Sequence, residues 1–130
     1  MHRSKIRIYL EDTDAQGVVY HANYLKYCER SRTDILMDQG FTLAELQAQG
    51  WTLVVHEMNI KFKRPARLHD DILVLTTARK SSEFRVTFHH DVFRDGEDKP
   101  LFIADVQVVA IGADGALVGM PEGLLSTPVA

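Results

Sequence analysis

The chain has 130 residues, of which 45% are hydrophobic and 25% charged, a composition typical of one ordered globular domain rather than of a disordered or fibrous protein. Its 15 basic and 18 acidic residues give a net charge of -3, so it lacks the long-range positive field that attracts nucleic acid. A single cysteine excludes an internal disulfide, and no apolar run approaches the roughly 20 residues that span a bilayer, so we expect a soluble cytoplasmic protein.

The N-terminal part of the chain predicts a short strand, a polar loop and one long helix. Apolar residues alternate along 6–10, which indicates a strand with one buried face. The segment 11–17 is polar and ends in glycine, so it predicts a loop. Along 22–37 the apolar residues follow a helical stripe, and the charged residues, Arg32 among them, fall mostly off that face. We therefore expect one long amphipathic helix.

A second, short helix is predicted directly after the first. Gly40 is well placed to end the long helix, and the segment 42–45 resembles a capping box that starts a new helix near Leu46. Gly50 is placed to close it.

The remainder of the chain predicts four more strands. Alternating or β-branched residues mark 57–63, 72–78, 84–92 and 101–111. Asp-Gly turn signals at 95–96 and 114–115 favour antiparallel neighbours, and the tail after Met120 is expected to be irregular. This order predicts a single α+β domain over 1–130, with a five-stranded antiparallel sheet and one dominant helix. Because one helix covers only one face, an edge or the other surface is the expected dimerisation site.

The segment 11–24 places a carboxylate, a glycine and the start of the long helix close together in sequence. The first turn of a helix has unpaired backbone N–H groups and the positive end of the helix dipole, so it can bind a carbonyl oxygen that gains negative charge. A carboxylate on the preceding loop can attack the carbonyl carbon or deprotonate a water molecule. These residues permit acyl hydrolysis but do not by themselves require it.

A family resemblance makes the chemistry more specific. Asp14, Gly17, Val19 and Tyr20 match the motif Asp-x-x-Gly-x-Val-Tyr, and the segment resembles the active site of the 4-hydroxybenzoyl-CoA thioesterase family. The chain is similar in particular to the YbgC-like acyl-CoA thioesterases of that family. The segments that carry this closer likeness are 11–14, 18–21, 27–33, 65–68 and 70–71.

The resemblance implies a hotdog fold, in which a five-stranded antiparallel sheet wraps around one long central helix. It also implies hydrolysis of acyl-CoA or related acyl thioesters without a cofactor. Members of the family form homodimers, often paired into homotetramers, and their active sites lie at the subunit interface. A partner subunit is therefore expected to complete the pocket.

The resemblance also implies roles for individual residues. The catalytic carboxylate falls on Asp14 and the polarising backbone N–H on His21, whose imidazole is a further candidate, while Gly17 allows the loop to approach closely. Whether the carboxylate forms an acyl-enzyme anhydride or activates water stays open. Lys63 and Arg64 form a basic cluster with Lys61 and Arg67. Binding of CoA phosphates and simple exposure on a solvated strand face are equal alternatives for the role of this cluster. The candidate substrate contacts are Gly17, Tyr20, Asn23, Tyr24, Lys63, Arg64 and Arg67, with Arg67 the strongest among the basic residues.

Several neighbouring residues have simpler interpretations. Asp12 is expected to be a cap or an exposed loop acid rather than a second catalytic carboxylate, and Asn23 is equally suited to cap the helix or to touch substrate. Tyr24 and Tyr27 are expected to pack in the core, and Cys28 to be a small buried hydrophobe.

Other polar residues of the chain have side chains that act as catalysts or metal ligands in proteins. Glu29 is expected to form an ion pair on the helix surface rather than to act as a catalyst. The segments 69–71 and 89–90 contain histidine and aspartate but lack the three or four spaced ligands of a metal site, so we predict neither metal nor cofactor.

Two other functions remain as alternatives to thioester hydrolysis. A hotdog hydratase or dehydratase carries histidine five residues after its aspartate, whereas position 19 here is valine. A non-catalytic module that binds acyl groups or acyl carrier protein is the second alternative, which the intact Asp14 disfavours. The acyl group itself stays open.

Overall fold

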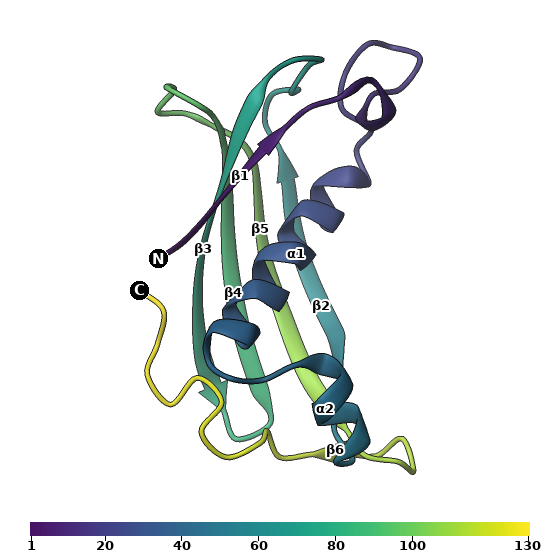
Figure 1. Ribbon diagram of the computed structural model, residues 1–130, viewed down its shortest axis with the longest axis vertical. Helices are drawn as coiled ribbons and strands as arrows, with labels where there is room; N and C mark the ends of the chain where they lie inside the picture. Colours follow the sequence, from purple (N-terminus) through teal and green to yellow (C-terminus); the bar gives the residue numbers. More distant parts are fainter.

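The computed structural model describes residues 1–130 as an antiparallel sheet packed against one long helix (Figure 1). The elements in chain order are β1 (His2–Arg7), a 3₁₀ turn η1 (Leu10–Asp12), α1 (Asn23–Asp38), α2 (Leu43–Ala48), β2 (Thr52–Phe62), β3 (Asp71–Ser82), β4 (Arg85–Arg94), β5 (Pro100–Ile111) and β6 (Leu117–Val118). The strand order is β1-β3-β4-β5-β2, with β6 paired to the end of β5. The predicted α+β architecture is therefore confirmed, with a two-residue strand in addition.

The helix α1 lies across one face of the sheet and begins within one residue of its predicted start (Figure 1). Tyr24, Cys28 and Leu36 are buried against the sheet, as expected. The prediction for Arg32 is wrong, because this side chain is only 8% exposed. Its guanidinium reaches between the helix and the sheet, where Nη1 lies 3.3 Å from Nε2 of His90.

The first strand is shifted from its predicted position. β1 ends at Arg7 because its pairing with β3 ends there, at Asp71. Ile8 is fully buried as the alternation predicts, but Leu10 is 73% exposed and begins the 3₁₀ turn. The carboxylate of Asp12 accepts the backbone N–H of Tyr9 at 2.8 Å, which stabilises the turn away from the sheet.

The strand β2 begins five residues earlier than predicted. A bulge between Val55 and Glu57 shifts its register against β5. Because an extra residue reverses which side chains face the core, the alternation is regular only after the bulge. The outer edge of β2 pairs with no strand, and Val55 and Phe62 on this strand are 46% and 55% exposed.

Specific contacts hold the start of α2 and the C-terminal tail. The hydroxyl of Thr42 accepts the N–H of Glu45 at 3.1 Å, which confirms Thr42 as the cap of the predicted second helix. The helix begins at Leu43, and the return contact from the Glu45 side chain that would complete a capping box is not formed. The C-terminal tail is irregular, as expected, but it also closes the core: Leu124 and Leu125 are buried, and the N–H of Leu125 donates to Oε1 of Gln39. No helix in the structure combines the length and the apolar character that crossing a bilayer requires.

Candidate active site

The loop before α1 is a tight hairpin that positions Asp14. Thr13 and Val19 form an isolated antiparallel bridge, and the N–H of Asp14 donates to the carbonyl of Val18 at 2.9 Å. Gly17 has φ +81°, the left-handed conformation that three-residue hairpin loops require at this position. A Cβ at Gly17 would meet no atom within 4 Å, so the backbone conformation, rather than close packing within this chain, explains the glycine.

Asp14 is half-buried as a residue, and one oxygen of its carboxylate is engaged. Oδ1 accepts the N–H of Gln16 at 2.8 Å, and Oδ2 accepts no hydrogen bond from the protein. Asp14 forms no ion pair. The turn therefore orients the carboxylate while leaving one oxygen available for chemistry.

Asp12 ties the hairpin to the start of α1. Besides the contact of its carboxylate with Tyr9, its carbonyl oxygen accepts the N–H of Tyr20 and Nδ2 of Asn23, both at 2.9 Å. These contacts match the expected structural role of Asp12. Asn23 is buried and does not cap the helix, because its amide donates to Asp12 instead.

The start of α1 presents free backbone donors. The N–H of Asn23 donates to the carbonyl of Tyr20 at 2.8 Å, whereas the N–H groups of His21 and Ala22 donate to no protein acceptor. These are the unpaired groups that a helix start leaves for an anionic ligand or a polarised carbonyl. The imidazole of His21 is exposed beside them.

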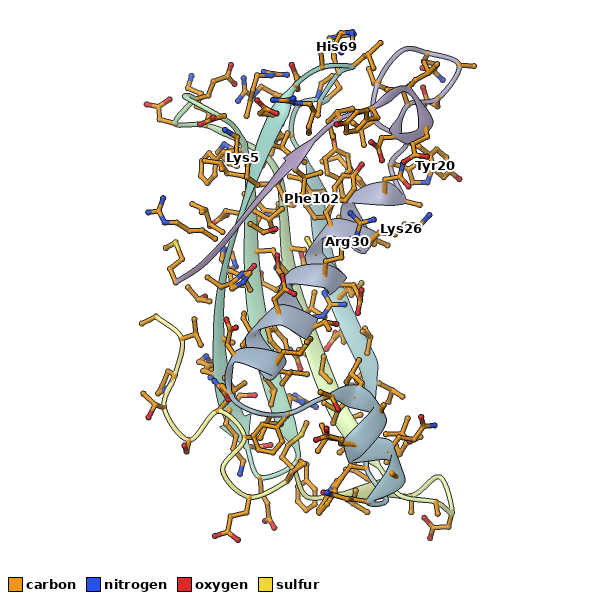
Figure 2. All side chains as sticks on the ribbon, in the orientation of Figure 1. Lys5, Tyr20, Lys26, Arg30, His69 and Phe102 are labelled. Atoms are coloured by element: carbon orange, nitrogen blue, oxygen red, sulfur yellow. The ribbon has the colours of Figure 1, made fainter.

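An open pocket of about 270 Å³ lies between this helix start and the end of β2. Its lining residues are Val18, Val19, His21, Tyr24, Phe62, Lys63, Arg64 and Pro65. Phe62 forms an aromatic wall, with its ring centroid 6.2 Å from that of His21 and 5.2 Å from that of Phe102. Figure 2 shows Phe102 beside the first turns of α1 and Tyr20 at the outer side of the helix start. The ring centroid of Tyr20 lies 4.6 Å from that of His21.

Tyr24 and Tyr27 pack in the core, as predicted. The hydroxyl of Tyr24 accepts the N–H of Ala66 at 3.0 Å, and burial raises the pKa of Tyr24. Burial, followed by the neighbouring carboxylate of Asp12, raises the pKa of Tyr27, whose hydroxyl has no hydrogen-bond partner. Both phenols are therefore held neutral.

The predicted basic cluster separates into paired and unpaired side chains. Nη2 of Arg64 lies 2.9 Å from Oε1 of Glu97 and donates to the carbonyl of Lys99. Lys63 lines the pocket and is exposed without an ion pair. Arg67 is also exposed and unpaired, and its backbone forms a bridge with Val18 of the hairpin loop. The structure thus brings Lys63 and Arg64 to the pocket and Arg67 beside the loop that carries Asp14.

The remaining candidates lie outside the pocket. Glu29 forms no ion pair, contrary to prediction, because its carboxylate accepts the hydroxyl of Thr33 at 2.6 Å. Cys28 is fully buried, and burial raises the pKa of its thiol to about 12, which makes it unreactive. His89 and His90 lie on opposite faces of β4, since His89 contacts Asp105 on the outer surface and His90 is buried.

The sequence did not predict one residue of the pocket, Phe62, and one buried residue outside it, Arg32. Phe62 was predicted only as a strand residue, although its position at the end of an edge strand exposes it to the pocket. The helical pattern predicts Arg32 off the buried face, whereas the structure buries it. Its spacing of four residues from both Cys28 and Leu36 was the signal that it shares their buried stripe.

Comparison with known proteins is consistent with this geometry. The thioesterase-like superfamily model matches residues 8–127. The acyl-CoA thioester hydrolase YbgC of Escherichia coli O6:H1 is 35% identical over 111 residues, which cover 85% of this chain and 82% of that protein. The acyl-CoA thioesterase YbgC of Haemophilus influenzae is 37% identical over 91 residues, covering 69% and 67% of the two chains.

Two solved structures share the fold over nearly the whole chain. A probable thioesterase from Bartonella henselae superposes with a TM-score of 0.83 at 32% identity, covering 92% of this chain and 98% of that one. A 1,4-dihydroxy-2-naphthoyl-CoA thioesterase from Synechocystis superposes with a TM-score of 0.88 at 23% identity, covering 94% and 90%. At that identity the second likeness concerns the fold alone.

Proposed function

The chain belongs to the thioesterase-like superfamily, and we propose that it hydrolyses acyl-CoA thioesters to a free acid and CoA, with Asp14 as the essential carboxylate. The hotdog fold and the YbgC-like relationship predicted from the sequence are confirmed. One observation supports the proposal for the site. The hairpin leaves one carboxylate oxygen of Asp14 without a hydrogen bond, and the helix start that follows it in the chain leaves the N–H of His21 without an acceptor.

The two free groups can divide the chemistry of thioester hydrolysis. The N–H of His21, with that of Ala22 beside it, donates to the thioester carbonyl oxygen, which gains negative charge as the carbon becomes tetrahedral. A single oxyanion donor contributes about 100- to 1,000-fold in rate. Collapse of the tetrahedral species re-forms the carbonyl and breaks the C–S bond, so that the CoA thiolate leaves.

Asp14 has two available routes to that species. As a general base it takes a proton from water while the water oxygen bonds to the carbonyl carbon. As a nucleophile its own oxygen forms that bond, and water later hydrolyses the resulting anhydride. Both routes use the oxygen that accepts no hydrogen bond from the protein.

The surroundings of the pocket suit an acyl-CoA. Aromatic side chains line its inner wall, Lys63 is an unpaired cation in its lining, and Arg67 is a second unpaired cation whose backbone bridges Val18 of the lining. These two side chains are our proposed partners for CoA phosphates, since hydrogen bonds to a charged phosphate are strong. Arg64 also lines the pocket, but its guanidinium stays paired with Glu97.

A second subunit completes the proposed site. The free edge of β2 ends at Phe62, so two chains that pair along this edge enclose the pocket between them. We propose a homodimer on this basis, and a homotetramer formed from two such dimers. The alternative function is a non-catalytic module that binds acyl groups carried by CoA or by acyl carrier protein.

Substitution of Asp14 by asparagine tests the catalytic assignment. The amide oxygen of Asp14→Asn still accepts the N–H of Gln16, so the hairpin and the unfolding temperature are expected to be unchanged. Release of free thiol from acyl-CoAs is expected to fall by about 1,000-fold, within the range attributed to general acid–base groups. Glu11→Gln removes an exposed acid from the same loop and is expected to keep full activity. Full activity in Asp14→Asn excludes this role, and a wild-type protein inert toward every thioester favours the binding module.

Substitution of Arg67 by alanine tests the phosphate contact. The KM for acyl-CoA is expected to rise by about tenfold, because one charge-assisted hydrogen bond is lost. The same acyl group on N-acetylcysteamine, which lacks the nucleotide, is expected to be hydrolysed as before. Arg3→Ala, at an exposed and unpaired arginine of β1, is the matched control. Equal effects of Arg67→Ala on both thioesters contradict the contact.

A further inference from the structure

A second cavity lies between the C-terminal half of α1 and the sheet. It has a volume of about 120 Å³, and nine of its 12 lining residues are hydrophobic. Leu53 and Val55 of β2 line one side, and Phe88 of β4 lines another. Glu29 and Arg32 are the charged residues in its wall. A cavity of this character suits an apolar group with one polar end.

The guanidinium of Arg32 is buried at this cavity without a carboxylate partner. The side chain is 8% exposed, and its one hydrogen-bond contact is the 3.3 Å approach of Nη1 to Nε2 of His90. Its central carbon lies 6.0 Å from the centroid of the Phe88 ring. Buried arginines are normally paired with an anion, and a guanidinium carries five N–H donors. Most of the donors of Arg32 are therefore left without a protein acceptor.

His90 accepts a hydrogen bond from Arg32 but does not neutralise it. Because arginine has no acceptor, Nε2 of His90 accepts and its Nδ1–H donates to the hydroxyl of Thr76 at 2.8 Å. Burial, together with the charge of Arg32, lowers the pKa of His90 to about 3, so the ring is neutral. Glu29 is exposed at the rim, bound to the hydroxyl of Thr33, and forms no ion pair with Arg32. The guanidinium thus has no ion-pair partner, and the carboxylate of Glu29 at the rim of the same cavity acts on it only at longer range.

The proposed dimer connects this cavity to the catalytic loop. Within one chain Val55 and Phe62 are seven residues apart along β2, roughly 23 Å at about 3.3 Å per residue. Figure 1 shows the end of β2 that carries Phe62 near the loop before α1, and the other end near α2. When two β2 edges pair antiparallel across a twofold axis, the Phe62 end of one chain lies beside the Leu53 end of the other. An acyl group that starts at one catalytic loop then points toward the cavity of the second copy.

We propose that this cavity holds the distal end of the acyl group and that Arg32 binds an acceptor oxygen carried there, so that the preferred substrates are short acyl-CoAs with an oxygenated end. The inference rests on the proposed thioesterase function. An engineered cavity of about 150 Å³ holds one benzene ring, so a cavity of about 120 Å³ limits the group to a short chain or a small ring. A carboxylate is favoured over a hydroxyl, because it accepts two parallel hydrogen bonds from a guanidinium.

Three acyl-CoAs of equal chain length test the preference in the wild-type protein. Pentanoyl-CoA, 5-hydroxypentanoyl-CoA and glutaryl-CoA each have five acyl carbons and end in a methyl, a hydroxyl and a carboxylate. We expect kcat/KM to rise in that order, with glutaryl-CoA hydrolysed about 10-fold or more faster than pentanoyl-CoA, as one hydrogen bond to a charged group allows. Equal values for the three, or a preference for the methyl end, overturn the proposal without any variant. If the wild-type protein hydrolysed none of the three, that result would contradict the proposed thioesterase function rather than the role of Arg32.

Replacement of Arg32 by methionine assigns the preference to the guanidinium. Arg32→Met keeps the length of the side chain and is expected to lower kcat/KM for glutaryl-CoA by about 10- to 100-fold while pentanoyl-CoA changes by less than about threefold. Arg30→Met, at an exposed arginine of the same helix labelled in Figure 2, is expected to change neither. A uniform loss on all three substrates indicates a structural role for Arg32 and contradicts the proposal.

A second variant keeps the test valid if Arg32→Met fails to fold. Val55→Phe fills the mouth of the cavity from a side chain that is already 46% exposed, so the fold is expected to tolerate it. It is expected to lower turnover of the five-carbon substrates by about 10-fold or more and to leave acetyl-CoA, which is too short to reach the cavity, within about twofold. Unchanged turnover of glutaryl-CoA in Val55→Phe excludes the cavity as the acyl site.

Discussion

Asp12 and Asp14 lie two residues apart, yet their contacts give them different roles. The carboxylate of Asp12 accepts a hydrogen bond from a backbone N–H of the loop. Its carbonyl oxygen accepts hydrogen bonds from Tyr20 and Asn23, which hold the loop to the helix. Asp14 has one oxygen in a local turn and the other unengaged. Because a catalytic carboxylate needs a free lone pair and a fixed direction, the hydrogen bonds favour Asp14. Asp12 is a positioning residue for the helix start that carries His21.

The buried His90 makes stability depend on pH. Its pKa is about 3 in the folded protein, whereas an unfolded histidine titrates near 6.5. Between these values the unfolded chain binds the proton more readily, so stability from this residue is present above pH ~6.5 and is lost as pH falls toward 3, by about 1.4 kcal/mol per pH unit. Denaturant unfolding at pH 7, 5.5 and 4.5 measures the slope. His90→Gln keeps an acceptor for Arg32 and is expected to flatten it, and an equal slope in both proteins contradicts this origin.

At the scale of single residues, the motif predicted the loop and the helix start, whose residues are close in sequence. It did not predict contacts between residues that are far apart in sequence. Asp14, Gly17 and the helix start are contiguous, so a family resemblance was enough to place them. The ion pair of Arg64 needs Glu97, and the burial of Arg32 needs His90. Those partners are brought close only by the packing of the sheet, which no spacing within the motif reveals.

The hairpin before α1 is the element that fixes the position of Asp14 relative to the start of the helix. Its loop of three residues reverses the chain, the bridge from Thr13 to Val19 joins its two arms, and the bridge from Val18 to Arg67 attaches it to the body of the protein. Gly17 supplies the left-handed conformation on which the reversal depends. The orientation of Asp14 therefore follows from backbone geometry rather than from packing of its side chain.

Substitution of Gly17 by alanine is expected to weaken both stability and catalysis. At φ +81° an L side chain costs about 1 kcal/mol, and the open space around the position means that no steric clash adds to it. Denaturant unfolding and kcat/KM measure the two effects, and Gly17→Asn is expected to restore part of each because asparagine tolerates this conformation. Gly96→Ala, at φ +85° with equally open surroundings in the turn after β4, is expected to lose similar stability but no activity. Full activity in Gly17→Ala with the stability loss intact shows that the hairpin does not orient Asp14.

Periodicity predicted the elements well where one pattern ran through a whole element. The long helix and the inner faces of β4 and β5 agree with it because each keeps one face buried throughout. The start of β2 was missed because its bulge changes the phase of the alternation midway. The two-residue β6 is too short to show any period.

At the scale of the molecule, the exposed edge of β2 leaves the proposed site open on one side. An 11-residue strand with an unpaired edge and exposed apolar side chains favours association with a second copy. The pocket and the second cavity lie at opposite ends of this strand. Pairing two such edges would therefore build two equivalent composite sites.

The dimer is tested by placing like charges near its expected axis. Residues near a twofold axis meet their own copies, so lysines at the exposed positions His56 and Asn59 would lie close to each other across the interface. Sedimentation equilibrium is expected to give a dimer for the wild type and a shift toward the monomer for His56→Lys/Asn59→Lys, with activity lost in parallel. Asp38→Lys, exposed at the end of α1, is expected to change neither. A wild-type protein that is monomeric and fully active contradicts the composite site.

The burial of Cys28 has a practical consequence for such experiments. The chain has one native thiol, and it is fully enclosed with its proton firmly bound. A cysteine introduced anywhere on the surface would therefore react alone with a maleimide dye, without removal of the native residue. Dyes attached along β2 would report the approach of two chains by energy transfer, in real time and on the enzyme with its core intact.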